Sequence, residues 1–335
     1  MSELLVFALL GVAVTVYALT AGADFGGGVW DLLASGPRRE AQRELIAEAI
    51  APIWEVNHIW MIFVVVVLFT VFPIAFAVVL TALHIPLLLV LVGIVLRGSA
   101  FVFRAYGLQP DEARARWGRV FAWASTITPV FLGMTFAALS SGHIHVNLET
   151  EEITSGFFAG WLGGLALATG LFALVLFALL AAVYLAREAE QRAQPELSAD
   201  FRKRALICEA LAFVLALLVL WRAYVESPTL FSGLLEVPWS IPAQLATAAA
   251  AGAAIFALVR GHVAAARVAV MIQVALIVLG WGLAMDGHLL LPNLHVADAG
   301  AEPAVLAALP AVLLGGTVVF APALWWLFRV FRKLD

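Results

Sequence analysis

Charged residues are scarce in this sequence, because Asp, Glu, Lys and Arg together make up 13% of its 335 residues. A water-soluble domain carries about 25% charged and about 45–50% apolar residues, whereas 64% of this chain is hydrophobic. Such a composition cannot give a folded chain a polar surface, so a soluble globular protein is excluded. The net charge is −4 and no run of basic residues occurs, which excludes a nucleic-acid-binding patch.

Cysteine is nearly absent as well. The one cysteine, Cys208, lies in an apolar stretch. A single cysteine excludes a disulfide within the chain and a cysteine-rich metal site. We expect Cys208 to pack as a small hydrophobic side chain.

The N-terminus lacks the features of a cleaved signal peptide. No basic residue precedes the apolar run that begins MSELLVFALLGVAV, and the run continues well past signal-peptide length. We therefore expect it to form the first membrane-spanning helix.

Long apolar runs fill most of the chain. A membrane-spanning helix needs about 20 apolar residues, and runs of this length satisfy their backbone groups in lipid as helices. The sequence therefore predicts an all-α integral membrane protein with about nine transmembrane helices. The runs cover residues 4–33, 49–72, 74–105, 117–141, 155–186, 203–225, 240–259, 263–285 and 304–330.

The basic residues test this count, because loops rich in Lys and Arg stay in the cytoplasm. If all the runs cross the membrane, every Lys and Arg except Arg97 and Arg222 falls at run ends on one side. The opposite loops carry acidic residues such as Glu149 and Asp298. A missed or added span would disturb this alternation, so we expect an external N-terminus and a cytoplasmic C-terminus.

Three charged residues fall inside the predicted helices: Asp24, Glu55 and Arg97. A charge within a bilayer costs at least about 2.5 kcal/mol on insertion scales, so each is a candidate functional residue. At about 1.5 Å per residue, they lie roughly 9–13 Å from the cytoplasmic helix ends. Neighbouring helices would bring them together. One acid could pair with Arg97 while the other exchanges a proton; the alternative is an ion pair with a purely structural role.

Polar side chains surround Glu55 in the sequence. Asn57 and His58 lie at similar depth, and the spacing of Glu55 and His58 places both on one helix face. This resembles half of a di-iron motif, but the chain has no second Glu-x-x-His, so we expect no metal.

Weaker candidates lie elsewhere. Glu209 falls in the cytoplasmic half of the sixth run and could be a second acidic site or an anchor at the helix end. His143, His145, His288 and His295 belong to external loops, where solvated histidines are commoner than metal ligands.

Three ordered segments carry a family resemblance. Residues 22–26 (GADFG) are similar to the pattern GFDxG, residues 50–60 (IAPIWEVNHIW) to APxWDxNxxW, and residues 96–104 (LRGSAFVFR) to FRxxxFxxR. These patterns occur in subunit II of the cytochrome bd-type quinol oxidases, and this chain resembles that family most clearly over about residues 20–105.

The resemblance implies a fold of two four-helix bundles and a peripheral helix. On this sequence, one transmembrane domain (1–335) would contain a first bundle at 1–141, a second at 155–285, and the ninth helix and C-terminus at 304–335. The implied location is the bacterial cytoplasmic (inner) membrane.

The resemblance also implies a non-haem subunit of an electrogenic complex that oxidises quinol and reduces dioxygen to water. Haem-bearing subunit I would hold b- and d-type haems; small single-span subunits are further expected partners. This chain would bind no haem or metal, although a structural quinone or lipid fits the family. Asp24 and Glu55 would line a cytoplasmic proton path supported by Asn57, His58 and Arg97. Trp60 would lie near a dioxygen route.

Two departures from the family pattern leave the electron donor open. Glu55 stands where Asp is usual, and His58 stands where other side chains are common, so a related oxidase using another donor is an alternative. Two further hypotheses start from the intramembrane charges and histidines. A proton-coupled transporter should show broken helices at matching points of two halves, and residues 24–28 have no clear counterpart. A haem-binding anchor should pair histidines at matched depth, and His58 and His84 do not match.

Overall fold

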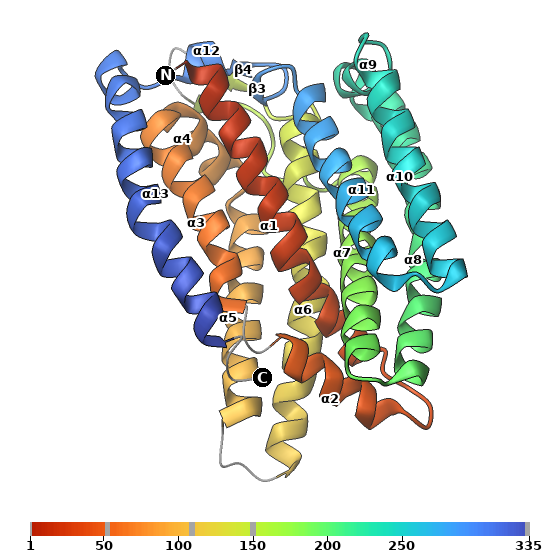
Figure 1. Cartoon of the computed structure of the whole chain (residues 1–335). Helices are drawn as coiled ribbons and strands as arrows, with labels where there is room; N and C mark the ends of the chain where they lie inside the picture. The colour runs from red at the N-terminus through yellow and green to blue at the C-terminus, as the bar shows by residue number, and fades with distance from the viewer. Residues whose placement is uncertain (1, 51–53, 107–110, 148–151, 332–335) are drawn as a thin grey trace.

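The computed structural model describes residues 2–50, 54–106, 111–147 and 152–331. Within these ranges some side chains near helix ends, including that of Glu55, lie outside the described part of the molecule. The described chain is almost entirely helical (Figure 1). Its helices are α1 (Glu3–Leu32), α2 (Arg39–Ile50), α3 (Trp54–Val71), α4 (Pro73–Ala82), α5 (His84–Tyr106), α6 (Asp111–Ser140), α7 (Gly164–Gln191), α8 (Pro195–Glu226), α9 (Pro228–Leu235), α10 (Ser240–Arg260), α11 (Val263–Ala284), α12 (Val296–Ala299) and α13 (Pro303–Phe331).

Two short antiparallel hairpins complete the described structure. Strand β1 (Val146–Asn147) pairs with β2 (Glu152–Ile153), and β3 (His288–Leu290) pairs with β4 (Leu294–His295). Both hairpins connect helices in segments that the sequence assigns to external loops.

The predicted all-α membrane fold is confirmed, and the count of about nine spans is approximate. Among the described residues, 7 helices are long and apolar enough to cross a membrane: α1, α5, α6, α7, α8, α10 and α11. The bent pair α3–α4 makes up to 8, and the described apolar part of α13 covers Pro303–Val319. Counting α3 and α13 as spans gives the arrangement that the alternation of charged loops predicts.

The third predicted run, 74–105, is divided in two by the structure. At the predicted boundary between the second and third runs, the chain bends by 119° between α3 and α4, with Pro73 as the first residue of α4. Proline disfavours helical backbone in the residue before it, and Phe72 has φ −129° and ψ 60°. Leu83 then ends α4, and α5 alone continues as the long helix.

Helix α1 packs between the two halves of the chain, contacting α3 and α6 on one side and α7 and α11 on the other. This close packing depends on glycine: a Cβ at Gly26 would overlap the backbone carbonyl of Phe177 on α7. The Trp30 indole then donates a hydrogen bond to the carbonyl of Ala178 at 2.8 Å. Small residues allow such approach of membrane helices, so α1 joins both halves into one core.

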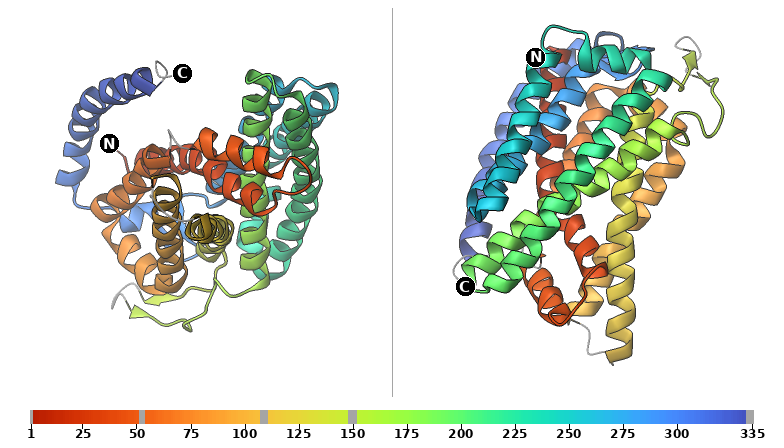
Figure 2. Two further views of the ribbon diagram at one scale, coloured as in Figure 1. Left: turned by 90° about the horizontal axis from the view of Figure 1, so that it is seen from below. Right: turned by 90° about the vertical axis from the view of Figure 1, so that its right-hand side faces the viewer.

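The remaining helices follow two groups. In the first half, α1 contacts α3 and α6, and α5 packs on α6; in the second, α8 packs on α7, and α10 and α11 pack together. Helix α13 lies at the edge, against α3 and away from α8 and α10 (Figure 2). The arrangement agrees with two four-helix groups and a peripheral helix.

Candidate functional site

The centre of the site is a buried ion pair between α1 and α5. Arg97 Nη2 donates a hydrogen bond to Asp24 Oδ1. The exposed fraction is 1% for the Arg97 side chain and 5% for that of Asp24. Two of the three intramembrane charges predicted to cluster are therefore in contact. Removing one partner from such a pair leaves a buried, uncompensated charge, which is strongly destabilising.

Aromatic rings enclose the arginine. Arg97 Cζ lies 5.1 Å from the ring centroid of Phe25 and 5.2 Å from that of Phe121. A guanidinium over an aromatic face is attracted by the ring quadrupole. Helices α1 and α6 thus hold Arg97 from both sides in an orientation that serves Asp24.

The polar residues of α3 border this pair. Asn57 is buried, and its side-chain amide donates a hydrogen bond to the Thr20 carbonyl of α1 at 3.5 Å. The His58 ring centroid lies 6.4 Å from that of Phe25 and 6.2 Å from that of Tyr17. The structure therefore places Asn57 and His58 in the cluster predicted around Asp24.

Two further residues predicted for the site, Trp60 and Glu55, also lie on α3. Trp60 is half-buried and packs against the main hydrophobic core. Glu55 lies in the first turn of α3, but its side chain is outside the described residues. Its place in the cluster stays a prediction.

Several polar atoms around the ion pair have no hydrogen-bond partner in the described part of the chain. Asp24 Oδ2, Arg97 Nε and the Tyr17 hydroxyl are buried without a hydrogen-bond partner among the described residues. An ionised carboxylate accepts hydrogen bonds at both oxygens. Asp24 can therefore accept a proton on Oδ2 while Oδ1 remains bound to Arg97.

A second ion pair, which the sequence analysis missed, joins the same two helices. Arg104 donates to both carboxylate oxygens of Asp31, at 3.1 and 3.2 Å, and Arg43 Nε lies 3.7 Å from Asp31 Oδ1. Both aspartates of α1 are therefore paired with arginines of α5. The sequence contained a signal: the acids and the arginines are each two helical turns apart, in the same direction.

This shared register carries information about topology. In each pair, the arginine follows the aspartate by 73 residues along the sequence. Matching offsets in both pairs mean that α1 and α5 run parallel. Parallel directions are what the first and third spans of an alternating chain require.

Glu209 lies apart from this cluster, on α8. The Gln273 amide of α11 donates to Glu209 Oε2 at 3.1 Å, and both residues are buried. Glu209 Oε1 and Gln273 Oε1 have no hydrogen-bond partner among the described residues. Glu209 is thus in the helix core, rather than an anchor at the helix end. The neighbouring Cys208 is buried, as expected.

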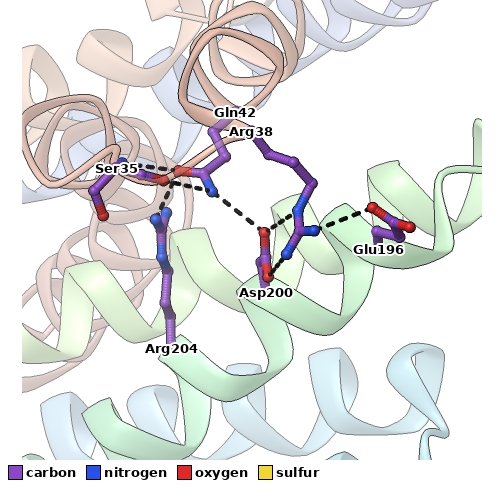
Figure 3. A network of polar contacts seen from close by, with 6 residues as sticks. All are labelled: Ser35, Arg38, Gln42, Glu196, Asp200 and Arg204. Atoms are coloured by element: carbon purple, nitrogen blue, oxygen red, sulfur yellow. Dashed lines mark hydrogen bonds and ion pairs between the residues drawn. The ribbon is translucent and has the colours of Figure 1, made fainter.

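A polar network joins α2 to the start of α8 (Figure 3). Arg38 donates to both oxygens of Asp200, at 2.8 and 2.6 Å, and to Glu196 at 3.1 Å. The Arg204 guanidinium donates to Gln42 Oε1 at 2.7 Å. The hydrogen bonds and charge of Asp200 raise the pKa of Arg38. This network fixes α2 across the end of the helices that the sequence assigns to the cytoplasm.

The loop histidines form a local pair. His288 and His295 face each other across β3 and β4, with ring centroids 5.0 Å apart. In the part of the chain that the structure describes, no group of three or more His, Cys, Asp or Glu could hold a metal ion.

Comparison with known proteins identifies the family. The model of the family described as "Cytochrome bd terminal oxidase subunit II" matches residues 2–331. The chain belongs to the cytochrome bd terminal oxidase subunit II family. It is accordingly a multi-pass membrane subunit of a respiratory terminal oxidase, as the sequence motifs predicted.

Individual relatives support the same family membership. It is 25% identical over 332 residues to a putative cytochrome bd menaquinol oxidase subunit II of Bacillus subtilis, covering 96% of this chain and 92% of the relative. It is 26% identical over 156 residues to cytochrome bd-I ubiquinol oxidase subunit 2 of Escherichia coli, covering 45% and 38%. Its fold matches a chain of the bd oxidase from Geobacillus thermodenitrificans with a TM-score of 0.79 at 20% identity, covering 99% of both chains.

Proposed function

We propose that this chain is the non-haem subunit of a quinol:oxygen oxidoreductase and supplies part of a cytoplasmic proton path. The family membership supports the oxidase role, and relatives are named as menaquinol and ubiquinol oxidase subunits. The observation that carries the proton path is the buried Asp24–Arg97 pair, in which the second carboxylate oxygen of Asp24 has no hydrogen-bond partner among the described residues.

The overall reaction defines the need for protons. Two quinols and one dioxygen give two quinones and two waters. The haems, b- and d-type, belong in this proposal to partner subunit I, whose assembly this chain supports; they supply the electron transfer and dioxygen chemistry. If protons for water come from the cytoplasm and quinol protons leave outside, turnover is electrogenic without a pump.

Each polar residue of the first helix group has its own role in the proposed proton path. Arg97 holds Asp24 in place and compensates its charge, while Oδ2 remains able to accept a proton. Glu55 precedes it as the acid nearer the cytoplasm. Asn57 and His58 complete the polar lining, and a carboxylic acid is a suitable relay where its surroundings balance the two protonation states.

The orientation of the chain is part of the proposal. The parallel directions of α1 and α5, and the basic loops, support an external N-terminus and a cytoplasmic C-terminus in the bacterial inner membrane. Reporter fusions after residues 40 and 195 should both report cytoplasmic. An external signal at residue 195 would contradict this orientation.

Two further roles are proposed. Trp60 borders a dioxygen route, as the resemblance implies, and Glu209, which lies inside the second helix group, is a second acidic site. A bound quinone and small single-span subunits are further expectations for the complex.

The test of the proton path separates it from a structural role of the pair. Asp24→Asn leaves Arg97 unpaired, so the double variant Asp24→Asn/Arg97→Gln removes both charges together. If Asp24 relays protons, the double variant should assemble with its haems and still turn over severalfold more slowly. The exposed acid in Asp298→Asn is the matched control. The assay is quinol-driven oxygen consumption at matched haem content, with membrane potential followed in liposomes.

Glu55 is tested in the same assay. Glu55→Gln keeps size and hydrogen bonding but cannot exchange a proton, so turnover should fall severalfold, whereas Glu55→Asp should retain much of the rate. Full turnover and full potential in both Glu55→Gln and the double variant would leave these acids as structural residues only.

A further inference from the structure

A groove of about 570 Å³ lies between α5 and α6. Its walls are apolar: Leu89 and Leu96 come from α5, and Trp123 and Ile127 come from α6. All four side chains are exposed in this chain. Inside a bilayer, such a groove is a surface for a hydrocarbon chain.

Two arginines close one end of the groove. Arg116 and Arg119 both line it and are three residues apart on α6, so they lie on one helix face. Both are exposed, and neither has an ion-pair partner among the described side chains. Other basic residues of the same end, Arg38 and Arg104, are paired with acids. The two groove arginines therefore offer positive charge that no described side chain of this protein neutralises.

The length of the groove suits one leaflet. From Arg116 to Phe131, its lining residues span roughly 22 Å along α6 at about 1.5 Å per residue. One leaflet contributes about 15 Å, half of a hydrocarbon core of about 30 Å, and the remainder reaches the headgroups. The arginine end is the cytoplasmic end in the proposed orientation.

The floor of the groove offers little to a neutral polar ligand. Helices α5 and α6 meet there at Gly93, where a Cβ would overlap Thr128 Oγ1. The Thr128 hydroxyl is buried and donates its hydrogen to the Ala124 carbonyl at 2.6 Å. A quinone carbonyl in the floor would thus find no free donor, and the charged groups lie only at the groove end.

We propose that this groove binds an anionic glycerophospholipid of the cytoplasmic leaflet. Its phosphate lies between Arg116 and Arg119, and an acyl chain follows the apolar walls past Trp123. Guanidinium groups match phosphate geometry with paired donors, and basic pockets between transmembrane helices on the cytoplasmic side bind anionic headgroups.

The experiment uses the whole oxidase complex. Wild-type and variant complexes are exchanged into nanodiscs of phosphatidylcholine with phosphatidylglycerol, re-extracted, and the retained lipids counted by native mass spectrometry. Arg116→Gln/Arg119→Gln should lower retained phosphatidylglycerol at least fivefold. Arg114→Gln is the matched control, because Arg114 is exposed on the same helix but does not line the groove, and it should retain lipid like wild type.

A second variant keeps both arginines. Leu96→Trp places a larger side chain in the groove and should also lower retention fivefold, with haem content confirming assembly. A photoreactive residue at position 127 should cross-link to phospholipid. Unchanged retention in Arg116→Gln/Arg119→Gln, equal retention of phosphatidylcholine, or a cross-link to quinone or to the partner subunit would each overturn the proposal.

Discussion

Two buried acids in the same chain have partners of different charge. Asp24, in the first helix group, is bound to the buried guanidinium of Arg97, whereas Glu209, in the second, is bound to the neutral amide of Gln273. Both acids are nearly inaccessible, with exposed fractions of 6% and 3%. Burial alone therefore does not define their chemistry, since the partner determines which protonation state the site favours.

The difference also concerns how each acid is held. Asp24 belongs to a pair of parallel helices with a second pair, Asp31–Arg104, two turns further along. Glu209 has a single hydrogen bond among the described residues, between α8 and α11. The first site is an ionic connection repeated along two helices, and the second is one neutral contact. The following variants test that contrast.

The largest effect is expected from Arg97→Leu. The change leaves Asp24 buried without its counter-charge, and breaking such a pair costs about 3–5 kcal/mol. The yield of assembled complex, measured by haem content after purification, should fall strongly. Arg114→Leu removes an exposed arginine and should leave the yield unchanged. Normal yield and activity in Arg97→Leu would show that the ionic connection at Asp24 is dispensable.

A smaller effect is expected from Asp31→Asn. The side chains of its partners, Arg104 and Arg43, are 23% and 29% exposed, so they can turn toward solvent when the carboxylate is lost. Loss of charge-assisted hydrogen bonds should then lower the free energy of unfolding by about 1.5–3 kcal/mol. Unfolding of the complex in detergent–SDS mixtures measures this, and a loss as large as that of Arg97→Leu would remove the distinction between buried and partly exposed pairs.

Glu209→Gln should have less effect than either. The new amide keeps an acceptor oxygen for Gln273, and no described cation depends on the charge of Glu209. The free energy of unfolding should change by less than about 1 kcal/mol, the net value of one neutral hydrogen bond. Glu209→Leu leaves the Gln273 amide unpaired and is the contrasting variant, with an expected loss of about 1–3 kcal/mol. A severe loss in Glu209→Gln would indicate an ionised acid.

The smallest effect is expected at Arg38, the partly exposed arginine of the network in Figure 3. The Arg38 side chain is 42% exposed, and surface ion pairs contribute little because water and salt screen them. Arg38→Ala should shift the unfolding midpoint less than the three variants above, and high salt should abolish the difference from wild type. A salt-independent shift would contradict screening by solvent.

The sequence by itself determined the class of protein and the family. Runs of this length satisfy their backbone groups in lipid as helices, so composition and order are sufficient for the class. The direction of the helices stays a prediction from the position of the arginines. The sequence also predicted that Asp24 and Arg97 meet, because an unpaired charge in a bilayer is unfavourable and these two lie at similar depth. The structure confirmed their contact.

Only the tertiary structure decided which faces of the helices meet. Rotation of a membrane helix is set by packing against its neighbours, so the pairing of Glu209 with Gln273 and of Asp31 with Arg104 is known only from the folded structure. The division of the third apolar run likewise came from the end of α4 at Leu83 and the start of α5 at His84, which hydrophobicity does not record. The depth of a residue in the membrane and its charge can be predicted from the order of the sequence. The rotation of each helix depends on contacts between residues that are far apart in the sequence.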